Sequence, residues 1–94
     1  MKLNFTSLEY FLKAAEMEHL TKAAEALHIA QPALSRTIRG LEEELNVTLF
    51  EKEGRNIRLT RDGHILLKYT ENFLREYKAM QQELEDSRNL QQLK

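Results

Sequence analysis

The 94-residue sequence contains no cysteine and no tryptophan, and proline occurs only once. Without cysteine the chain has neither a disulfide framework nor a thiolate for catalysis, which suits a reducing compartment. No apolar run approaches the ~20 residues needed to span a bilayer, and the N-terminus lacks the apolar segment of a signal peptide. We therefore expect a soluble, cytoplasmic protein that does not associate with membranes.

An excess of charge of either sign is also missing. The chain has 14 lysines and arginines against 15 aspartates and glutamates, for a net charge of −1. Overall charge thus gives no support to nucleic-acid binding, and a DNA-binding surface would have to come from the placement of individual charges. The length predicts one small domain with a modest core that oligomerisation would help to stabilise.

Residue patterns that carry catalysis or bind metals are sparse. His19, His28 and His64 lack the close spacing of a helical metal-binding pair, and there is no glycine-rich phosphate loop. Ser35 has no histidine at a helical step from it and no oxyanion motif around it. The sequence therefore predicts a protein that is not an enzyme and that needs no metal or cofactor.

Residues 20–45, LTKAAEALHIAQPALSRTIRGLEEEL, predict two helices joined by a tight turn. Four apolar residues of the second segment recur at helical steps, which places them on one face that we expect to be core. They are Leu34, Ile38, Leu41 and Leu45. Proline is tolerated in the first turn of a helix, so the second helix should begin at Gln31 or Pro32.

The opposite face of this second helix is polar and cationic. Pro32, Arg36 and Arg39 lie nearly opposite the apolar face, and Ser35 lies at its flank. These groups are of the kind that a DNA groove accepts. Taken alone, a pair of helices with a solvated basic face explains the same pattern.

The flanking segments predict one helix before this pair and a short β-hairpin after it. Thr6 and Glu9 form a possible capping box, so the first helix should begin near Ser7 and run to about residue 17 or 18. Its predicted buried residues are Leu8, Phe11, Leu12 and Ala15. Thr21 is the expected N-cap of the second helix. Lys22, at the exposed start of that helix, could meet a phosphate or remain a solvated lysine.

Asn46 accepts a left-handed helix end, and the β-prone residues 47–50 follow it. A turn at residues 52–55 and an alternating strand at residues 56–59 complete a two-stranded wing with Arg55 near its tip. Arg55 is either a DNA contact or an exposed loop charge.

The last helix should be capped by Thr60, with Asp62 in its first turn, and could extend for up to ~33 residues or about 50 Å. Its apolar residues keep heptad-like steps, with Thr70 between the first two. They are Leu66, Phe73, Tyr77, Met80 and Leu84. Because a domain of this size cannot cover so long a helix, a second chain is the natural partner.

The two segments TKAAEALHIAQPALSRTIRGLEEEL and VTLFEKEGRNIRLTRDG together resemble the N-terminal DNA-binding domain of LysR-type transcriptional regulators, from about Leu3 to Gly63 without a gap. The resemblance implies a mainly α fold: a winged helix-turn-helix of three helices and a short two-stranded wing, followed by a long linker helix. We expect the DNA-binding domain at residues 1–59, with the helix-turn-helix at about 20–39 and the wing at about 47–59. Residues 60–94 would be the linker and dimerisation helix.

The resemblance also implies the roles of single residues. It assigns the major-groove contacts to Gln31, Pro32, Ser35 and Arg36, with Lys22 and Arg39 as candidates for backbone contacts. It places Arg55 of the wing at the minor groove or the adjacent backbone. The chain departs from the family pattern at Gly40, where a basic residue is common, at Asn46, where glycine is common, and at Lys52, where arginine is common.

The expected function is therefore promoter recognition in bacteria. The chain would bind double-stranded DNA at an inverted-repeat site as a homodimer, with antiparallel pairing of the linker helices, and the resemblance allows a tetramer in a full-length protein. A small-molecule effector would act only through an effector-binding domain, which is absent from this chain. The rival hypothesis is a winged-helix protein that contacts other proteins and has lost DNA binding, and the near-neutral charge is its main support.

Overall fold

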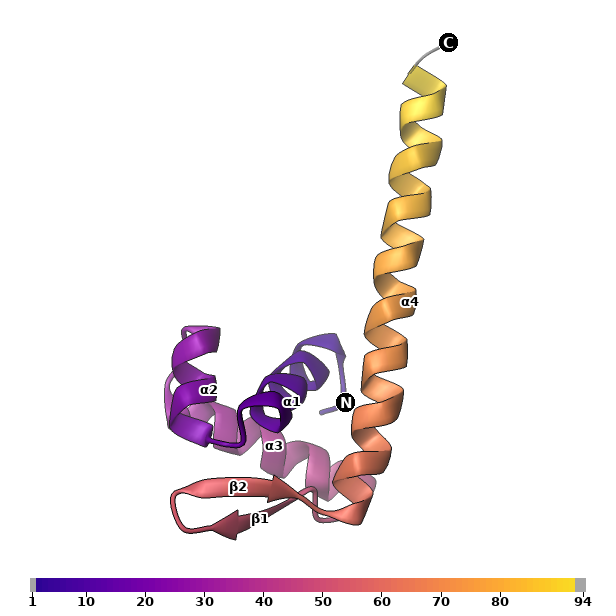
Figure 1. Ribbon diagram of the computed structural model, residues 1–94. Helices are drawn as coiled ribbons and strands as arrows, with labels where there is room; N and C mark the ends of the chain where they lie inside the picture. The colour runs from indigo at the N-terminus through magenta and orange to yellow at the C-terminus, as the bar shows by residue number, and fades with distance from the viewer. Residues whose placement is uncertain (1, 93–94) are drawn as a thin grey trace.

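In the computed structural model, which describes residues 2–92, three short helices and a β-hairpin pack together and a long helix projects from them (Figure 1). The elements are α1 (Phe5–Met17), α2 (Leu20–Leu27), α3 (Gln31–Leu45), β1 (Phe50–Glu53), β2 (Asn56–Leu59) and α4 (Arg61–Gln92). The molecule measures 59 × 26 × 22 Å because α4 rises far beyond the rest (Figure 1). The predicted fold class, a winged helix-turn-helix followed by a long helix, is confirmed.

The core consists of two apolar clusters. One lies among α1, α2, α3 and β2, and its buried members are Ala14, Ala23, Ala24, Leu34, Ile38 and Ile57. The other joins Phe11, Leu41 and Leu49 beneath the start of α4. In the first cluster, three alanines at the crossing of α1 and α2 let these helices approach closely. Leu45 was predicted to belong to the core but is 37% exposed, because it lies in the last turn of α3, just before the chain turns away at Asn46.

The first two helices begin earlier than predicted. Asn4, rather than Thr6, is the N-cap of α1, and it forms a reciprocal capping box with Ser7 in which both hydrogen bonds are 2.8 Å long. Both residues are good caps, but the choice of Asn4 brings Leu3 against the Phe11 cluster. Leu12, predicted to be buried, is only partly so.

His19, rather than Thr21, caps α2, and its Nδ1 accepts a hydrogen bond of 3.2 Å from the Lys22 N–H. Glu18 ends α1 in the left-handed conformation, at φ 52, so His19 directly after it is already extended and free to act as the cap. α3 begins at Gln31 with Pro32 in its first turn, as predicted, and ends at Leu45 with Asn46 left-handed at φ 56.

The wing is shorter than predicted because residues 47–49 form a loop rather than a strand. In that loop the Leu49 N–H donates to the Glu42 carboxylate at 2.7 Å, and the Leu49 carbonyl accepts from the Thr60 N–H at 3.0 Å. β1 and β2 pair antiparallel from Phe50↔Leu59 to Glu53↔Asn56, which leaves a two-residue loop with Gly54 at φ 65. The Ile57 N–H donates to the Glu18 carbonyl at 3.0 Å and so ties the wing to the α1–α2 corner.

The hydroxyl of Thr60 accepts from the Gly63 N–H at 2.9 Å, which confirms the predicted cap of α4. α4 packs against α1 and β2 in its first half, where Leu74 is the last partly buried residue. Residues 75–91 are exposed, although the Tyr77 ring still meets that of Phe5 on α1. Within the described part of the chain, no helix combines the length and apolar character needed to cross a membrane.

Candidate nucleic-acid interface

The opening turns of α3 present four of the predicted DNA-contacting side chains together. The Gln31 Nε2 donates to the Ser35 Oγ at 2.7 Å, so these two residues, one helical turn apart, orient each other. The Ser35 proton and the Gln31 carbonyl oxygen stay available as donor and acceptor. Pro32 and Arg36 are exposed beside them. The first two turns of α3 therefore carry a donor, an acceptor and a cation.

The predicted basic contacts are exposed and unneutralised. Among residues 2–92, Lys22, Arg36, Arg39 and Arg55 take part in no ion pair. Arg58, by contrast, is held by Glu53 across the wing at 3.4 Å. These four side chains could therefore contact an anionic partner without first breaking an ion pair.

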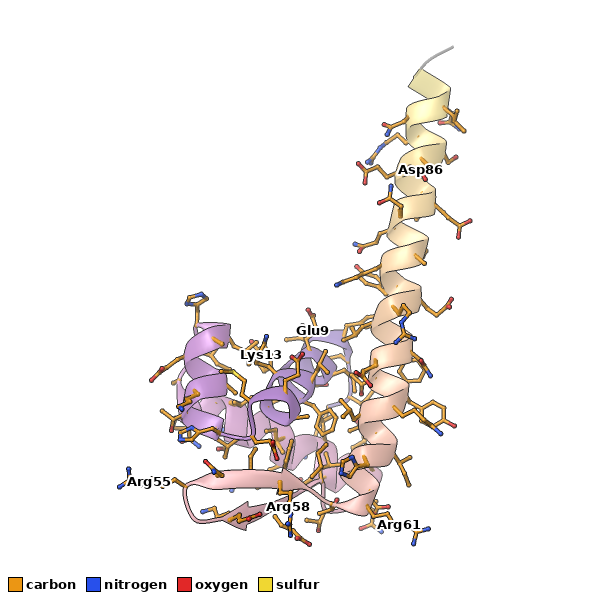
Figure 2. All side chains as sticks on the ribbon, viewed as in Figure 1. Glu9, Lys13, Arg55, Arg58, Arg61 and Asp86 are labelled. Atoms are coloured by element: carbon orange, nitrogen blue, oxygen red, sulfur yellow. The ribbon has the colours of Figure 1, made fainter. Side chains whose placement is uncertain are left out.

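The wing and the starts of α2 and α3 enclose an open hollow of about 480 Å³. Gln31 and Arg55, far apart in the sequence, both line it, together with Thr21, Lys52 and Asn56. Figure 2 shows Arg55 extending outward from the tip of the wing. In the sequence, Lys52 belongs to a turn signal and is a departure from the family pattern, and Asn56 belongs to a strand; neither is predicted to contact DNA. The hairpin register, which could not be fixed from the sequence, is what brings them to the hollow.

The C-terminal half of α3 is acidic, and its carboxylates are already engaged. Glu42 accepts from the Leu49 N–H, Glu43 pairs with Lys2 at 2.7 Å, and Glu44 accepts from the Leu3 N–H. The hydrogen bond from Lys2, together with its charge, lowers the pKa of the Glu43 carboxyl. The glutamates therefore anchor neighbouring segments to α3, while its N-terminal half stays free.

The predicted dimerisation residues divide into two groups. Leu66 packs partly against the domain's own cluster of Phe11, Leu41 and Leu49. Phe73, Met80 and Leu84 are exposed by 49%, 45% and 62%. Tyr77 is 39% exposed, and its ring lies 4.8 Å, between centroids, from that of Phe5 on α1. The outward part of the predicted stripe thus begins at Phe73.

Two further apolar residues extend this outward face toward the start of α4. Ile65 and Tyr69 are about half exposed, and the Tyr69 ring lies 6.4 Å from that of Phe73. They were missed because the heptad pattern was started from Leu66. The steps of four from Ile65 to Tyr69 to Phe73 are the signal that could have identified them.

The three histidines lie in separate places. His19 caps α2, His28 ends it in the left-handed conformation at φ 59, and His64 is exposed in the first turn of α4. Within residues 2–92, no three histidine, aspartate or glutamate side chains are grouped so that they could hold a metal ion.

Comparison with known proteins agrees with the helix-turn-helix fold described above. Residues 5–64 match the model of the family described as "Bacterial regulatory helix-turn-helix protein, lysR family". Relatives include the HTH-type transcriptional regulator YybE of Bacillus subtilis, 45% identical over 83 residues, which are 88% of this chain and 28% of YybE. The transcriptional dual regulator GltC of the same organism is 57% identical over 61 residues, which are 65% of this chain and 20% of GltC.

Solved structures match over most of the chain. The crystal structure of the CbnR DNA-binding domain in complex with DNA superposes with a TM-score of 0.86 at 32% identity, covering 90% of this chain and 98% of that one. The BenM DNA-binding domain bound to catB site 1 DNA gives 0.85 at 37% identity, covering 89% of this chain and 93% of that one.

The fold and these matches define a winged helix-turn-helix domain of a transcriptional regulator rather than an enzyme. More particularly, the chain belongs to the LysR family of bacterial regulatory helix-turn-helix proteins. It spans less than a third of the length of the two relatives described above.

Proposed function

We propose that this chain is the promoter-recognition part of a LysR-type regulator, which binds an inverted-repeat site on double-stranded DNA as a homodimer in the bacterial cytoplasm. The observation that carries the proposal is the polar surface of the first two turns of α3, where Gln31 and Ser35 orient each other beside an exposed Arg36. The solved DNA complexes of CbnR and BenM domains with the same fold support it.

α3 would enter the major groove by its N-terminal end. An α-helix of about 10–12 Å diameter fits a groove about 12 Å wide, and the N-terminal residues of a recognition helix are those that reach base edges. The anchoring of Glu42, Glu43 and Glu44 at the other end of α3 is consistent with this polarity. Gln31, Pro32, Ser35 and Arg36 are the proposed base-contacting residues.

The remaining cations would hold the DNA backbone. Lys22 at the start of α2 and Arg39 on α3 are placed as phosphate contacts, since each is exposed and unpaired among the described residues. Arg55 would reach the adjacent minor groove or its backbone from the tip of the wing. The hollow between α2, α3 and the wing is lined by polar groups and could follow one phosphate strand.

The homodimer would form through the exposed apolar face of α4. Two copies related by a two-fold axis require a target with matching symmetry, which is an inverted repeat. A full-length protein could assemble further into a tetramer. A small-molecule effector would act through a domain outside these 94 residues, since the relatives are more than three times as long.

The proposal is tested by replacing Arg36 with alanine. A bidentate arginine-to-guanine contact contributes about 1–3 kcal/mol of discrimination, so Arg36→Ala should weaken binding to a selected site about 5- to 150-fold and leave binding to random-sequence DNA nearly unchanged. Fluorescence anisotropy on both duplexes measures this difference. Arg36→Lys is the matched variant, because it keeps the charge and loses the planar fork. Equal losses on the two duplexes would make Arg36 a phosphate contact instead.

The role of the wing is tested by Arg55→Ala. Each phosphate neutralised contributes about 0.9 to the slope of log affinity against log salt concentration, so the variant should bind with a slope shallower by about one. Arg58→Ala is the control from the same hairpin, and we expect a smaller change because Arg58 lies away from the tip of the wing and does not line the hollow that Arg55 shares with Gln31. An unchanged slope for Arg55→Ala would remove the wing tip from the interface.

A further inference from the structure

In the N-terminal segment, the side chain of Lys2 lies across the flank of α3. A Cβ atom added to Gly40 would come within 3.3 Å of the Lys2 Cδ and 3.7 Å of its Cβ, so the Lys2 side chain lies directly over the glycine. Its Nζ lies 2.7 Å from the Glu43 Oε2, and the Leu3 N–H bonds to Glu44 next to it. The segment is therefore fixed on α3 at two successive residues.

Lys2 adds a positive charge beside Gly40, a position of α3 that has no side chain of its own to carry one. Arg36, Gly40 and Glu43 follow one another along a single flank of the helix at steps of four and three residues. An open cavity of about 500 Å³ runs beside this flank, and Lys2, Arg36 and Arg39 all line it. Without Lys2, this row would end in the Glu43 carboxylate, with Arg39 one turn away as the nearest positive charge of α3.

The flank of a helix in the major groove faces the phosphates of the groove wall, since the helix nearly fills the width of the groove. The Glu43 carboxylate on that flank would repel them. The pair that Lys2 forms with Glu43 is open to solvent, with both side chains about 60% exposed, and such exposed pairs are weak. The Lys2 ammonium can therefore move from the carboxylate to a phosphate at little cost.

We propose that Lys2, in the N-terminal segment, contacts the DNA backbone beside α3. Its ammonium would bind a phosphate of the groove wall on the same flank as Arg36. The inference rests on the proposed docking of α3 in the major groove and adds a contact from outside the helix-turn-helix. It is independent of base sequence, because an ammonium on a phosphate does not read bases.

The test is a salt titration of binding to a fluorescein-labelled random-sequence duplex, followed by anisotropy. Lys2→Ala should make the slope of log affinity against log salt shallower by about 0.9, and affinity at low salt should fall several-fold. The matched control is Lys13→Ala, because Lys13 also pairs with a glutamate, Glu16 at 3.7 Å, but on α1 and away from the cavity. Lys13→Ala should leave the slope unchanged.

A rescue variant checks the position of the charge. In Lys2→Ala/Gly40→Lys, most of the side chain that crowded Gly40 is gone, so a lysine at position 40 can deliver its ammonium along the same flank. It should restore most of the lost slope. Failure of this rescue in a variant that folds normally by circular dichroism would count against the assigned position.

Comparing Lys2→Ala with and without Glu43→Gln shows whether Lys2 contacts a phosphate or only neutralises Glu43. If Lys2 binds a phosphate, Lys2→Ala should still lower the slope in a Glu43→Gln background. If it acts only by masking Glu43, the loss should vanish there, and the proposal is overturned. An unchanged slope for Lys2→Ala, while Arg36→Ala weakens the selected site, would reject Lys2 alone. Full affinity of Arg36→Ala on the selected site would instead reject the docking of α3 itself.

Discussion

Replacing Gly63 with alanine should destabilise the domain, although alanine is the better helix former. A Cβ atom at this position would overlap the carbonyl oxygen of Leu49 and lie 2.7 Å from the Leu59 Cδ2. The Leu49 carbonyl cannot move easily, because it accepts from the Thr60 N–H and belongs to a residue of the buried core. Overpacking of this kind costs about 1–3 kcal/mol or more, against at most about 1 kcal/mol gained in helix propensity.

The chain contains a matched control in Gly40, which lies within α3 and meets only the flexible side chain of Lys2. Gly40→Ala should therefore be neutral or stabilising by about 0.5–1 kcal/mol, the usual effect of replacing a mid-helix glycine. Thermal unfolding at equal protein concentration compares the two, and 1 kcal/mol should shift Tm by about 4–8 °C in a domain of this size. A Gly63→Ala variant as stable as Gly40→Ala would show that α4 can shift away from Leu49.

The boundaries that the sequence predicted correctly are those at which one residue type is clearly preferred. Pro32 marked the first turn of α3, Asn46 its left-handed end, and Thr60 the cap of α4. The predicted start of α1 was wrong because two nearby residues are both suitable N-caps. Asn4 and Thr6 both qualify locally, and only the position of Leu3 against the core distinguishes them.

Tertiary hydrogen bonds explain why the wing is shorter than the sequence predicts. Residues 47–49 have high β-propensity, yet Leu49 is held by Glu42 and Thr60 in a loop where it has no strand partner. Glu18 and His28 are left-handed helix ends without being glycine or asparagine; histidine adopts this conformation more often than most residues, but nothing in the residue type of Glu18 indicates it. The close approach at Gly63 likewise joins segments that only the fold brings together.

The candidate site was predictable to the extent that it lies on one helix. Helical periodicity puts Gln31 and Ser35 one turn apart on α3, where a hydrogen bond joins them, and Arg36 next to Ser35 is exposed. The hollow shared with the wing, and Lys2 on the flank of α3, could not be predicted because they depend on how separate segments pack. Their role in DNA binding is what the Arg36, Arg55 and Lys2 variants measure.

On α4, the sequence could not distinguish residues that face the domain from those that face outward. Both faces are apolar, and the residues of each recur at helical spacing along the same stretch of sequence. Three leucines face the domain and are partly buried: Leu66, Leu67 and Leu74. Phe73 and Met80 face outward and are about half exposed. A heptad pattern started at Leu66 therefore mixed the two. The structure narrows the proposed dimer face to the outward residues, and the sharpest test must avoid Tyr77, which also contacts Phe5.

The double variant Phe73→Lys/Met80→Lys should convert the proposed dimer into a monomer. Both side chains are about half exposed on the outward face, where two charges per chain would have to be buried against a partner. Circular dichroism should show a folded protein, since neither residue belongs to the two core clusters. Sedimentation should give the monomer mass. Affinity for an inverted repeat should fall by about 10²–10⁴-fold to that of a single half-site, because linkage of the two domains is lost.

Lysine is chosen because added positive charge favours DNA binding, so a loss of affinity cannot come from electrostatic repulsion. The matched control is Gln82→Lys/Asn89→Lys, which adds the same two charges on the opposite face of α4. It should remain a dimer and bind the inverted repeat at least as tightly as the unmodified chain. If Phe73→Lys/Met80→Lys still sediments as a dimer, the outward face of α4 is not the interface. Recognition of an inverted repeat would then require a two-fold contact elsewhere on the molecule.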